Sequence, residues 1–254
     1  MFAGKPLVLA VLTVLASPSW SADEGGVNPY RPSVSNPAQL PAPGQLELEF
    51  GGLHEKKGRA RDDSLPYLFK LGFSKQWGML LGGDAHLWSR DEQGARTHGA
   101  GDTTLTLKRA FIVNEATAFG MELGAKLPTA RQSMGSGKAD YALTAIYSQD
   151  IGPAHMDANL VATRIGAPDA GAARMEKALS VAFLLPLTTH WSGVAEASGV
   201  RRGGTPTTAQ VLTAIAYSPN KKFSIDAGVA KGLNGASHDW SFFTGVVVPV
   251  AGLW

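Results

Sequence analysis

Ionisable side chains recur in this sequence at even spacing within short segments that alternate between apolar and polar residues. Because successive side chains of a β-strand point to opposite faces, even spacing places these groups on one face. The residues of this face are Lys70, Asp84, His86, Lys108, Glu122, Lys126, Asp157, Glu196, Gln210 and Asp226. Such a mixed set of charges can line an aqueous path and orient a polar solute. It can also simply cross-link a protein wall through paired charges.

Catalysis is the second chemistry to consider. His190 and Ser192 share a strand face, and His86 has Asp84 on its own face. A nucleophile needs a base within hydrogen-bond reach, and no serine is placed to complete the Asp84 and His86 pair. The histidines show no spacing typical of metal ligands, and the chain has no cysteine. We therefore expect no enzyme, no metal and no cofactor, and keep a hydrolase embedded in the fold as a minor alternative.

The segments that must position these residues have the length of strands that cross a membrane. A tilted spanning strand needs about 9–11 residues. The expected strands are 45–51, 65–73, 77–87, 102–111, 117–127, 141–151, 156–165, 175–185, 191–198, 208–217, 223–233 and 240–250. Their even number suits a bacterial single-chain barrel. We predict an all-β fold, a transmembrane antiparallel up-and-down β-barrel of about twelve strands over residues 45–254.

The connections alternate between longer and shorter ones, which predicts the orientation. The longer connections contain residues 54–58, 89–94, 131–137, 168–171, 201–204 and 234–236. Barrels of the outer membrane have short periplasmic turns and longer external loops. We therefore expect the longer connections outside and both chain ends on the periplasmic side.

Aromatic residues predict two girdles on the lipid face. One set lies near the expected periplasmic strand ends: Phe73, Trp77, Phe111, Phe119, Tyr147, Trp191, Tyr217 and Phe223. The other set lies at the opposite ends: Phe50, Tyr67, Tyr141 and Trp240. Amphipathic rings favour the headgroup level of a bilayer. A water-soluble barrel or sandwich is the alternative, but its rings would be spread along the strands.

Some residues break the alternation or carry charge outward. Leu80, Ile146, Val161, Val194, Leu212 and Phe243 fall on the inward face. Either the lumen is partly apolar, or bulges shift some strands. Arg164, Lys177 and Lys231 point outward near external strand ends, where they can contact lipopolysaccharide phosphates or extend to water.

The sequence of the N-terminal region predicts an export signal followed by a flexible lead. Residues 1–22 combine Lys5, an apolar run too short to span a bilayer, and small residues suited to cleavage. Residues 23–44 contain five prolines, Pro29, Pro32, Pro37, Pro41 and Pro43, which oppose helix and sheet. We expect a periplasmic lead, with a small plug inside the lumen as the alternative. No basic tract with interleaved aromatic residues indicates a nucleic-acid partner.

Several strand ends resemble those of a known family. They are the runs 101–108 (GDTTLTLK), 122–129 (ELGAKLPT) and 135–141 (GSGKADY), followed by the strand pair up to Arg164. Over residues 45–254 the chain resembles the outer-membrane transporter family of the MetA pathway of phenol degradation. Trp254 supplies the terminal aromatic residue that the insertion machinery recognises, although Pro249 and Gly252 should interrupt the last strand. The resemblance implies transport of aromatic or other small organic molecules.

We therefore expect a Gram-negative outer-membrane channel for passive uptake of small organic solutes, exported by a cleaved signal. The solute-path candidates are Asp84, His86, Lys108, Glu122, Lys126, Glu196 and Asp226. The expected partners are the solute, outer-membrane lipid with lipopolysaccharide, and the barrel-insertion machinery. A structural or surface-interaction barrel with a closed lumen is the alternative function.

Overall fold

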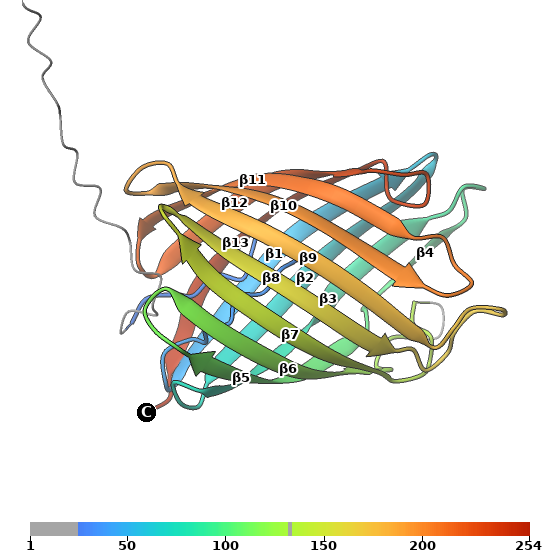
Figure 1. Cartoon of the computed structure of the whole chain (residues 1–254). Helices are drawn as coiled ribbons and strands as arrows, with labels where there is room; N and C mark the ends of the chain where they lie inside the picture. Colours follow the sequence, from blue (N-terminus) through green and yellow to red (C-terminus); the bar gives the residue numbers. More distant parts are fainter. Residues whose placement is uncertain (1–24, 132–133) are drawn as a thin grey trace, which may run out of the picture.

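In the part of the chain that the structure describes, the alternating segments form thirteen strands that pair with antiparallel neighbours in one sheet (Figure 1). The computed structural model describes residues 25–131 and 134–254, so the expected signal at 1–22 lies outside the described residues. The strands are β1 (Gln45–Lys57), β2 (Ala60–Gly72), β3 (Trp77–Arg90), β4 (Arg96–Gly99), β5 (Thr103–Ile112), β6 (Thr117–Leu127), β7 (Asp140–Ile151), β8 (Ala154–Arg164), β9 (Met175–Pro186), β10 (Trp191–Arg202), β11 (Thr208–Asn220), β12 (Phe223–Gly232) and β13 (Trp240–Gly252). β1 pairs with both β2 and β13, and β2 also pairs with β3, so the sheet closes into a cylinder, while β4 pairs with β3 alone. The wall thus has twelve strands, and the predicted antiparallel barrel is confirmed.

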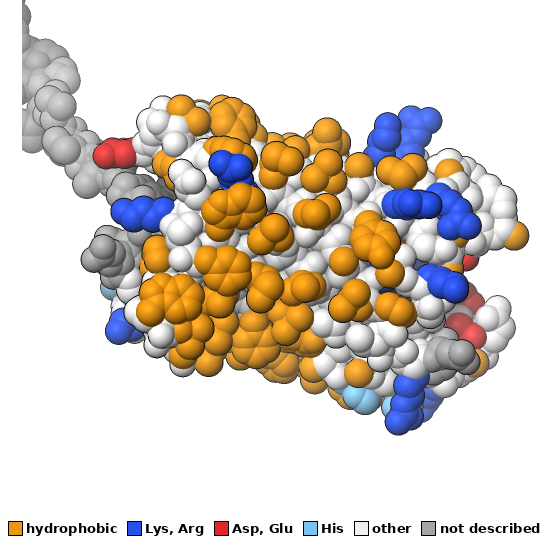
Figure 2. All heavy atoms as spheres, turned by 90° about the horizontal axis from the view of Figure 1, so that it is seen from below, with side chains coloured by type: hydrophobic (Ala, Val, Ile, Leu, Met, Phe, Trp, Pro, Cys, Tyr) orange, Lys and Arg blue, Asp and Glu red, His pale blue; other side chains and the backbone are white. Residues whose placement is uncertain are grey.

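The wall separates an apolar outer face from a polar interior. Side chains such as Leu123, Leu143 and Leu160 are about half exposed or more on the outside. Figure 2 shows a broad apolar surface on one face of the barrel. Buried polar groups, Lys108 and Glu196 among them, point into the lumen from alternate positions. This arrangement suits a wall that meets lipid on one side. Among the described residues, no helix is long and apolar enough to cross a membrane.

Aromatic rings lie on the outer face near both ends of the barrel. Trp191 and Tyr217 stack with their ring centroids 4.7 Å apart, and Phe119 lies 5.2 Å from Tyr147. At the other end, Trp240 is 42% exposed. Rings in two bands match the headgroup levels of a bilayer and place its apolar core between them.

The two ends of the barrel differ in their connections. At the turn end the links are residues 73–76, 113–116, 152–153, 187–190 and 221–222, and at the loop end they include 128–139, 165–174, 203–207 and 233–239. The C-terminus lies at the turn end, near Gly44. The alternation of short and long connections therefore holds for most of the chain.

The first predicted loop is wrong, and the second is shorter than predicted, since residues 91–95 still connect two strands. Residues 54–58 continue β1, and the link to β2 is a tight turn at Gly58, whose φ is +58°. Likewise β3 continues to Arg90 and forms a hairpin with β4. Both hairpins keep their backbone hydrogen bonds beyond the apolar belt, because paired strands satisfy their own polar groups in water.

The expected interruption of the last strand is also wrong. β13 runs through Pro249 to Gly252. Its register with β1 shifts between Leu46 and Glu47, so that Val250 is skipped. A bulge accommodates a proline because it removes the need for one ladder donor.

The apolar belt predicts a depth-dependent cost of charge. Leu123→Arg, near the middle of β6, should lower the free energy of unfolding by about 2–4 kcal/mol, and Leu127→Arg, at the loop end, by about 1 kcal/mol or less. Urea unfolding of protein reconstituted in lipid vesicles measures both. Equal costs at the two positions would contradict the assignment of the belt.

Candidate functional site

Residues 28–41, which we name the plug, lie inside the lumen. The segment enters beside the turn at Lys221, where Val27 N–H donates to the Lys221 carbonyl, and returns to β1 at Gln45. Tyr30, Ser35 and Ala38 are at most 3% exposed. The flexible periplasmic lead expected for 23–44 is therefore wrong for these residues, and the alternative of a luminal plug describes them. Figure 1 shows this blue segment within the barrel near the C-terminus.

The plug is held mainly through its backbone N–H groups. Prolines keep the segment out of the sheet, so these buried donors need acceptors elsewhere. The acceptors are luminal side chains. Tyr30 N–H donates to Glu49 at 2.7 Å, Val34 and Ser35 N–H both donate to one Glu196 oxygen at 2.8 and 2.9 Å, and Ala38 N–H donates to Ser148 at 2.8 Å.

Asparagine 36 joins the apex of the plug to the middle of the wall. Its backbone N–H donates to the Asn159 side chain at 2.7 Å, and its carbonyl accepts from the same amide at 2.9 Å. Its side-chain amide lies 3.1 Å from both oxygens of Glu122. One residue of the plug thus contacts both β6 and β8, the two strands on either side of β7.

Two buried lysines enclose Tyr30. The Nζ atoms of Lys70 and Lys108 lie 4.3 and 4.1 Å from the centre of its ring, a cation–π distance. Lys70 binds Glu47 at 2.9 Å and Glu49 at 2.5 Å, and Lys108 binds Glu122 at 3.1 Å. Burial, with Glu122 and other nearby carboxylates, raises the pKa of Tyr30 well above its usual value. Its neutral phenol donates to the Gln39 carbonyl at 2.8 Å.

Arginine 31 lies across the seam where the barrel closes. Its guanidinium binds Asp226 of β12 at 3.1 and 3.2 Å. Gly51 of β1 and Gly245 of β13 face each other across the seam, and a Cβ at either would collide with this guanidinium. The wall is therefore built around the plug as well as bonded to it.

The lumen is partly apolar, which explains the residues that break the alternation. Val194, Leu212 and Ala230 form a buried cluster against which Phe243 packs. Ile146 packs with Ala118 and with Ala38 of the plug. The register shifts of the barrel lie at 46–47, 64–66 and 217–220, away from these positions. Of the two explanations, the apolar lumen is the one that the structure supports.

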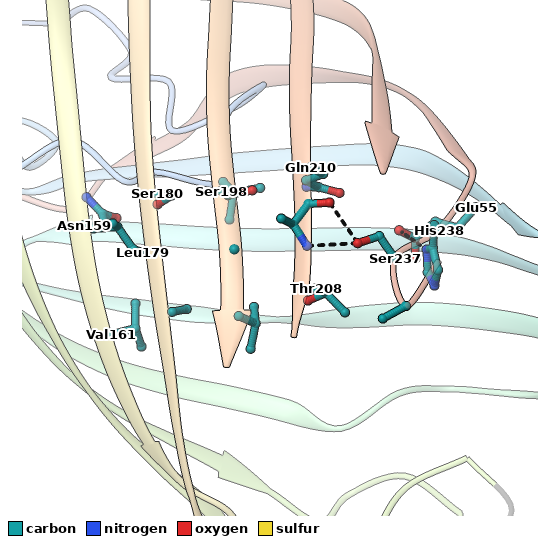
Figure 3. Close-up of a pocket in the computed structure, with 16 residues that line it drawn as sticks. Glu55, Asn159, Val161, Leu179, Ser180, Ser198, Thr208, Gln210, Ser237 and His238 are labelled. Carbon is teal, nitrogen blue, oxygen red and sulfur yellow. Dashed lines mark hydrogen bonds and ion pairs between the residues drawn. The ribbon is translucent and has the colours of Figure 1, made fainter. Parts of the chain in front are cut away.

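A cavity of about 290 Å³ remains on the loop-end side of the plug, beside Val34 (Figure 3). One side consists of side chains from β8 to β11, among them Asn159, Ser180, Ser198 and Gln210. The other side is the link before β13, where Ser237 exchanges two hydrogen bonds with the backbone of Ala209 at 2.8 and 2.9 Å. His238 Nδ1 lies 2.8 Å from a Glu55 carboxylate oxygen at its edge. Hydroxyls and amides interspersed with apolar side chains suit a small organic molecule.

The family-like strand ends hold the loop end together. Lys126 lies between Asp102 at 3.6 Å and Asp140 at 2.6 Å. The same carboxylates accept backbone N–H groups, Ala130 at 3.0 Å for Asp102 and Gly166 at 2.8 Å for Asp140. These residues therefore fasten two long connections to the wall, which indicates a structural task.

The predicted solute-path residues separate into two groups. Lys108, Glu122, Glu196 and Asp226 are buried and contact the plug. Lys126 is at the loop end, as are Asp84 and His86, which are half-buried. The His86 ring stacks on Trp88 at 4.2 Å and on His98 at 5.7 Å in the β3–β4 hairpin. Four of the predicted solute-path residues thus bind the plug, and the other three lie nearer the loop end of the lumen.

The outward cations also differ from one another. Arg164, Lys177 and Lys231 are all exposed at loop-end positions of the wall. Lys231, however, already stacks over the Trp240 ring at 4.4 Å. The neighbouring Arg201, which the sequence-based selection omitted, is outward and exposed opposite Lys177.

The histidine pairs considered for catalysis lack the geometry for it. His190 Nδ1 lies 3.2 Å from the Ser218 carbonyl, and in the described part of the chain no hydrogen bond joins it to Ser192. A cluster that the sequence did not reveal places His155 between Asp150 at 2.5 Å and Asp157 at 3.2 Å. Its serine, Ser148, donates to Asp157 and not to the imidazole. Within the described residues, no three His, Asp or Glu side chains form a metal-binding group.

Sequence reasoning missed Tyr30, Arg31 and Asn36 of the plug. One signal for them was present: Glu47 and Glu49 have inward phase beside Lys70, and the inward carboxylates outnumber the inward cations. Buried carboxylates need donors, so donors had to come from outside the strands.

Comparison with known proteins agrees with this architecture. The family model described as "Putative MetA-pathway of phenol degradation" matches residues 31–248, which include most of the plug. The crystal structure of an outer membrane channel from Pseudomonas putida F1 superimposes with a TM-score of 0.65 at 15% identity, over 84% of this chain and 98% of that chain. The KdgM porin superimposes with a TM-score of 0.52 at 14% identity, over 80% and 99%. No curated protein matches the sequence. At these identities the two structures show a shared fold.

The buried pair of Lys108 and Glu122 predicts an asymmetric mutational effect. Lys108→Met should lower the free energy of unfolding by roughly 3–5 kcal/mol, because it leaves Glu122 buried without its cation. The double variant with Glu122→Gln should recover most of that loss. Lys126→Met is the matched control, since its side chain is about a third exposed and its pairs contribute about 1 kcal/mol or less. Urea unfolding measures the loss of stability in each variant. Equal losses for Lys108→Met and Lys126→Met would contradict the special role of the buried pair.

Proposed function

The chain belongs to the family described as "Putative MetA-pathway of phenol degradation", and from that premise we propose that it is an outer-membrane channel for passive uptake of small organic solutes. The loop end faces outward and the plug closes the periplasmic half of the lumen. The observation that carries the proposal is the solute-sized cavity between the loop end and the plug. The family description makes phenol-like aromatic molecules the first solutes to test.

The composition of the cavity supports a solute with an apolar body and a polar edge. Val34 and Val161 offer apolar contact, while Ser180, Ser198 and Gln210 offer hydrogen bonds. Pockets that bind small molecules commonly combine a mostly apolar lining with a few polar groups that fix orientation. Passage is downhill, because the barrel supplies a path and binding groups, and a solute gradient supplies the direction.

The plug favours a second candidate, a barrel whose lumen stays closed and which serves as a structural or surface-interaction protein. Its backbone N–H groups donate to Glu49 and Glu196, and two buried lysines of the wall, Lys70 and Lys108, lie against its Tyr30 ring. The two functions differ in one property: a channel requires the plug to shift, whereas a closed barrel does not.

A reversible lock on the plug separates the two functions. The chain has no cysteine, and Ala38 of the plug packs against Ala118 of the wall in one buried cluster. A double variant, Ala38→Cys with Ala118→Cys, should therefore allow a disulfide between plug and wall. We expect an ionised phenolic acid such as 4-hydroxybenzoate, whose charge keeps it from crossing bare lipid readily, to enter liposomes that contain the reduced variant. Its entry should stop after oxidation and resume after reduction, as measured by liposome swelling.

The single cysteine variants under the same oxidant are the controls and should transport throughout. If the wild-type and reduced proteins fold but pass no solute, the closed-barrel function replaces the channel. If the oxidised double variant transports as fast as the reduced one, the path does not depend on movement of the plug.

A further inference from the structure

Three cations form a contiguous group on the outside of the barrel at the loop end. Arg164, Lys177 and Arg201 lie on the neighbouring strands β8, β9 and β10, and all three are exposed in the outward phase. Lys177 is directly opposite Arg201 in the ladder. Arg164 is opposite Met175, two residues from Lys177 on the same face. We name these three residues the rim cluster.

The rim cluster has no acidic partner within the described chain. The nearby carboxylates of Asp169 and Glu176 face Arg202 instead, at 3.0 and 4.0 Å. None of the three cations takes part in an ion pair or hydrogen bond among the described residues. Like charges directly opposite each other in a sheet are destabilising. The cluster therefore lowers the stability of the isolated barrel, and a bound anion would offset that cost.

The position of the rim cluster relative to the apolar belt indicates where that anion lies. Immediately toward the middle of the wall, the outward residues are Leu160 and Leu179, both 57% exposed. Tyr141, opposite Arg164, is 56% exposed at the same level. Charge in the middle of a bilayer costs about 2–4 kcal/mol but close to nothing at the interface. In Figure 2, Lys and Arg side chains lie on the right, at the edge of the apolar surface.

We propose that the rim cluster binds phosphate groups of lipopolysaccharide in the outer leaflet. The proposal rests on the outer-membrane location and orientation given above. Arginine presents a planar fork that matches phosphate oxygens, and a lysine between two arginines adds a compact charge. Lys231, expected from the sequence to share this task, is excluded because its ammonium is already stacked on Trp240.

The test compares a double variant, Lys177→Gln with Arg201→Gln, with the control Lys231→Gln. Each full-length protein is purified in detergent, and its thermal unfolding is followed at increasing concentrations of lipopolysaccharide. Wild type and control should gain stability on addition. The double variant should bind roughly tenfold or more weakly, because each basic residue near an anionic lipid surface contributes to binding. Without lipopolysaccharide, the double variant should be at least as stable as wild type, since the opposed charges are gone.

Two further lipids define the outcomes. Dephosphorylated lipopolysaccharide should stabilise the wild type only weakly. Its effect should not exceed the small effect of intact lipopolysaccharide on the double variant. The proposal is overturned if the double variant keeps the wild-type response, if the dephosphorylated lipid works equally well, or if phosphatidylglycerol produces the same gain. Solute entry into liposomes, measured on the same variants, should be unchanged. The lipopolysaccharide result therefore stands whether or not the protein proves to be a channel.

Discussion

Hydrogen bonding between the backbone of the plug and the carboxylates of the lumen is the interaction on which the rest of the structure depends. A proline-rich segment cannot complete its hydrogen bonds with itself, and a carboxylate inside a protein cannot remain without donors. In this structure the two requirements are met together. Glu49 and Glu196 accept hydrogen bonds from N–H groups of the plug, which have no strand partner. The charged side chains of the lumen and the prolines of the plug therefore depend on each other.

This interaction divides the interior into unlike halves. Toward the turn end the lumen is filled and its charges are paired, with Tyr30 enclosed by two lysines. Toward the loop end there is open volume beside Val34, lined by hydroxyls, amides and small apolar groups. The outer face does not share this division, since exposed large apolar side chains occur on almost every strand of the wall. The outer surface is thus apolar along the whole belt that meets lipid, while the two halves of the lumen differ in how they are filled.

The wall could be predicted from the sequence because it depends on a local rule. Alternation with a period of two predicted twelve strands and the inward phase of Lys108, Glu122, Glu196 and Asp226, all of which point into the lumen. The plug could not be predicted in this way, since its partners are far away in the chain: Arg31 and Asp226 are 195 residues apart. The hairpin of β1 and β2 was mistaken for a loop because its end lies in water on both faces and so loses the apolar alternation. Arg201 was overlooked because its importance comes from the strand beside it, through Lys177.

The position of Arg31 over Gly51 and Gly245 bears on how the barrel is assembled. The plug bonds to β1 across only 18 or 19 residues of sequence, so it can fold onto the first strand as a local unit. The partner of Arg31, Asp226, lies on β12, and β13 meets β1 directly beneath the guanidinium. The first and last strands thus come together around a side chain that neither of them supplies. One N-terminal residue, Arg31, therefore belongs both to the contacts that fill the cylinder and to the surroundings of the strand pair that closes it.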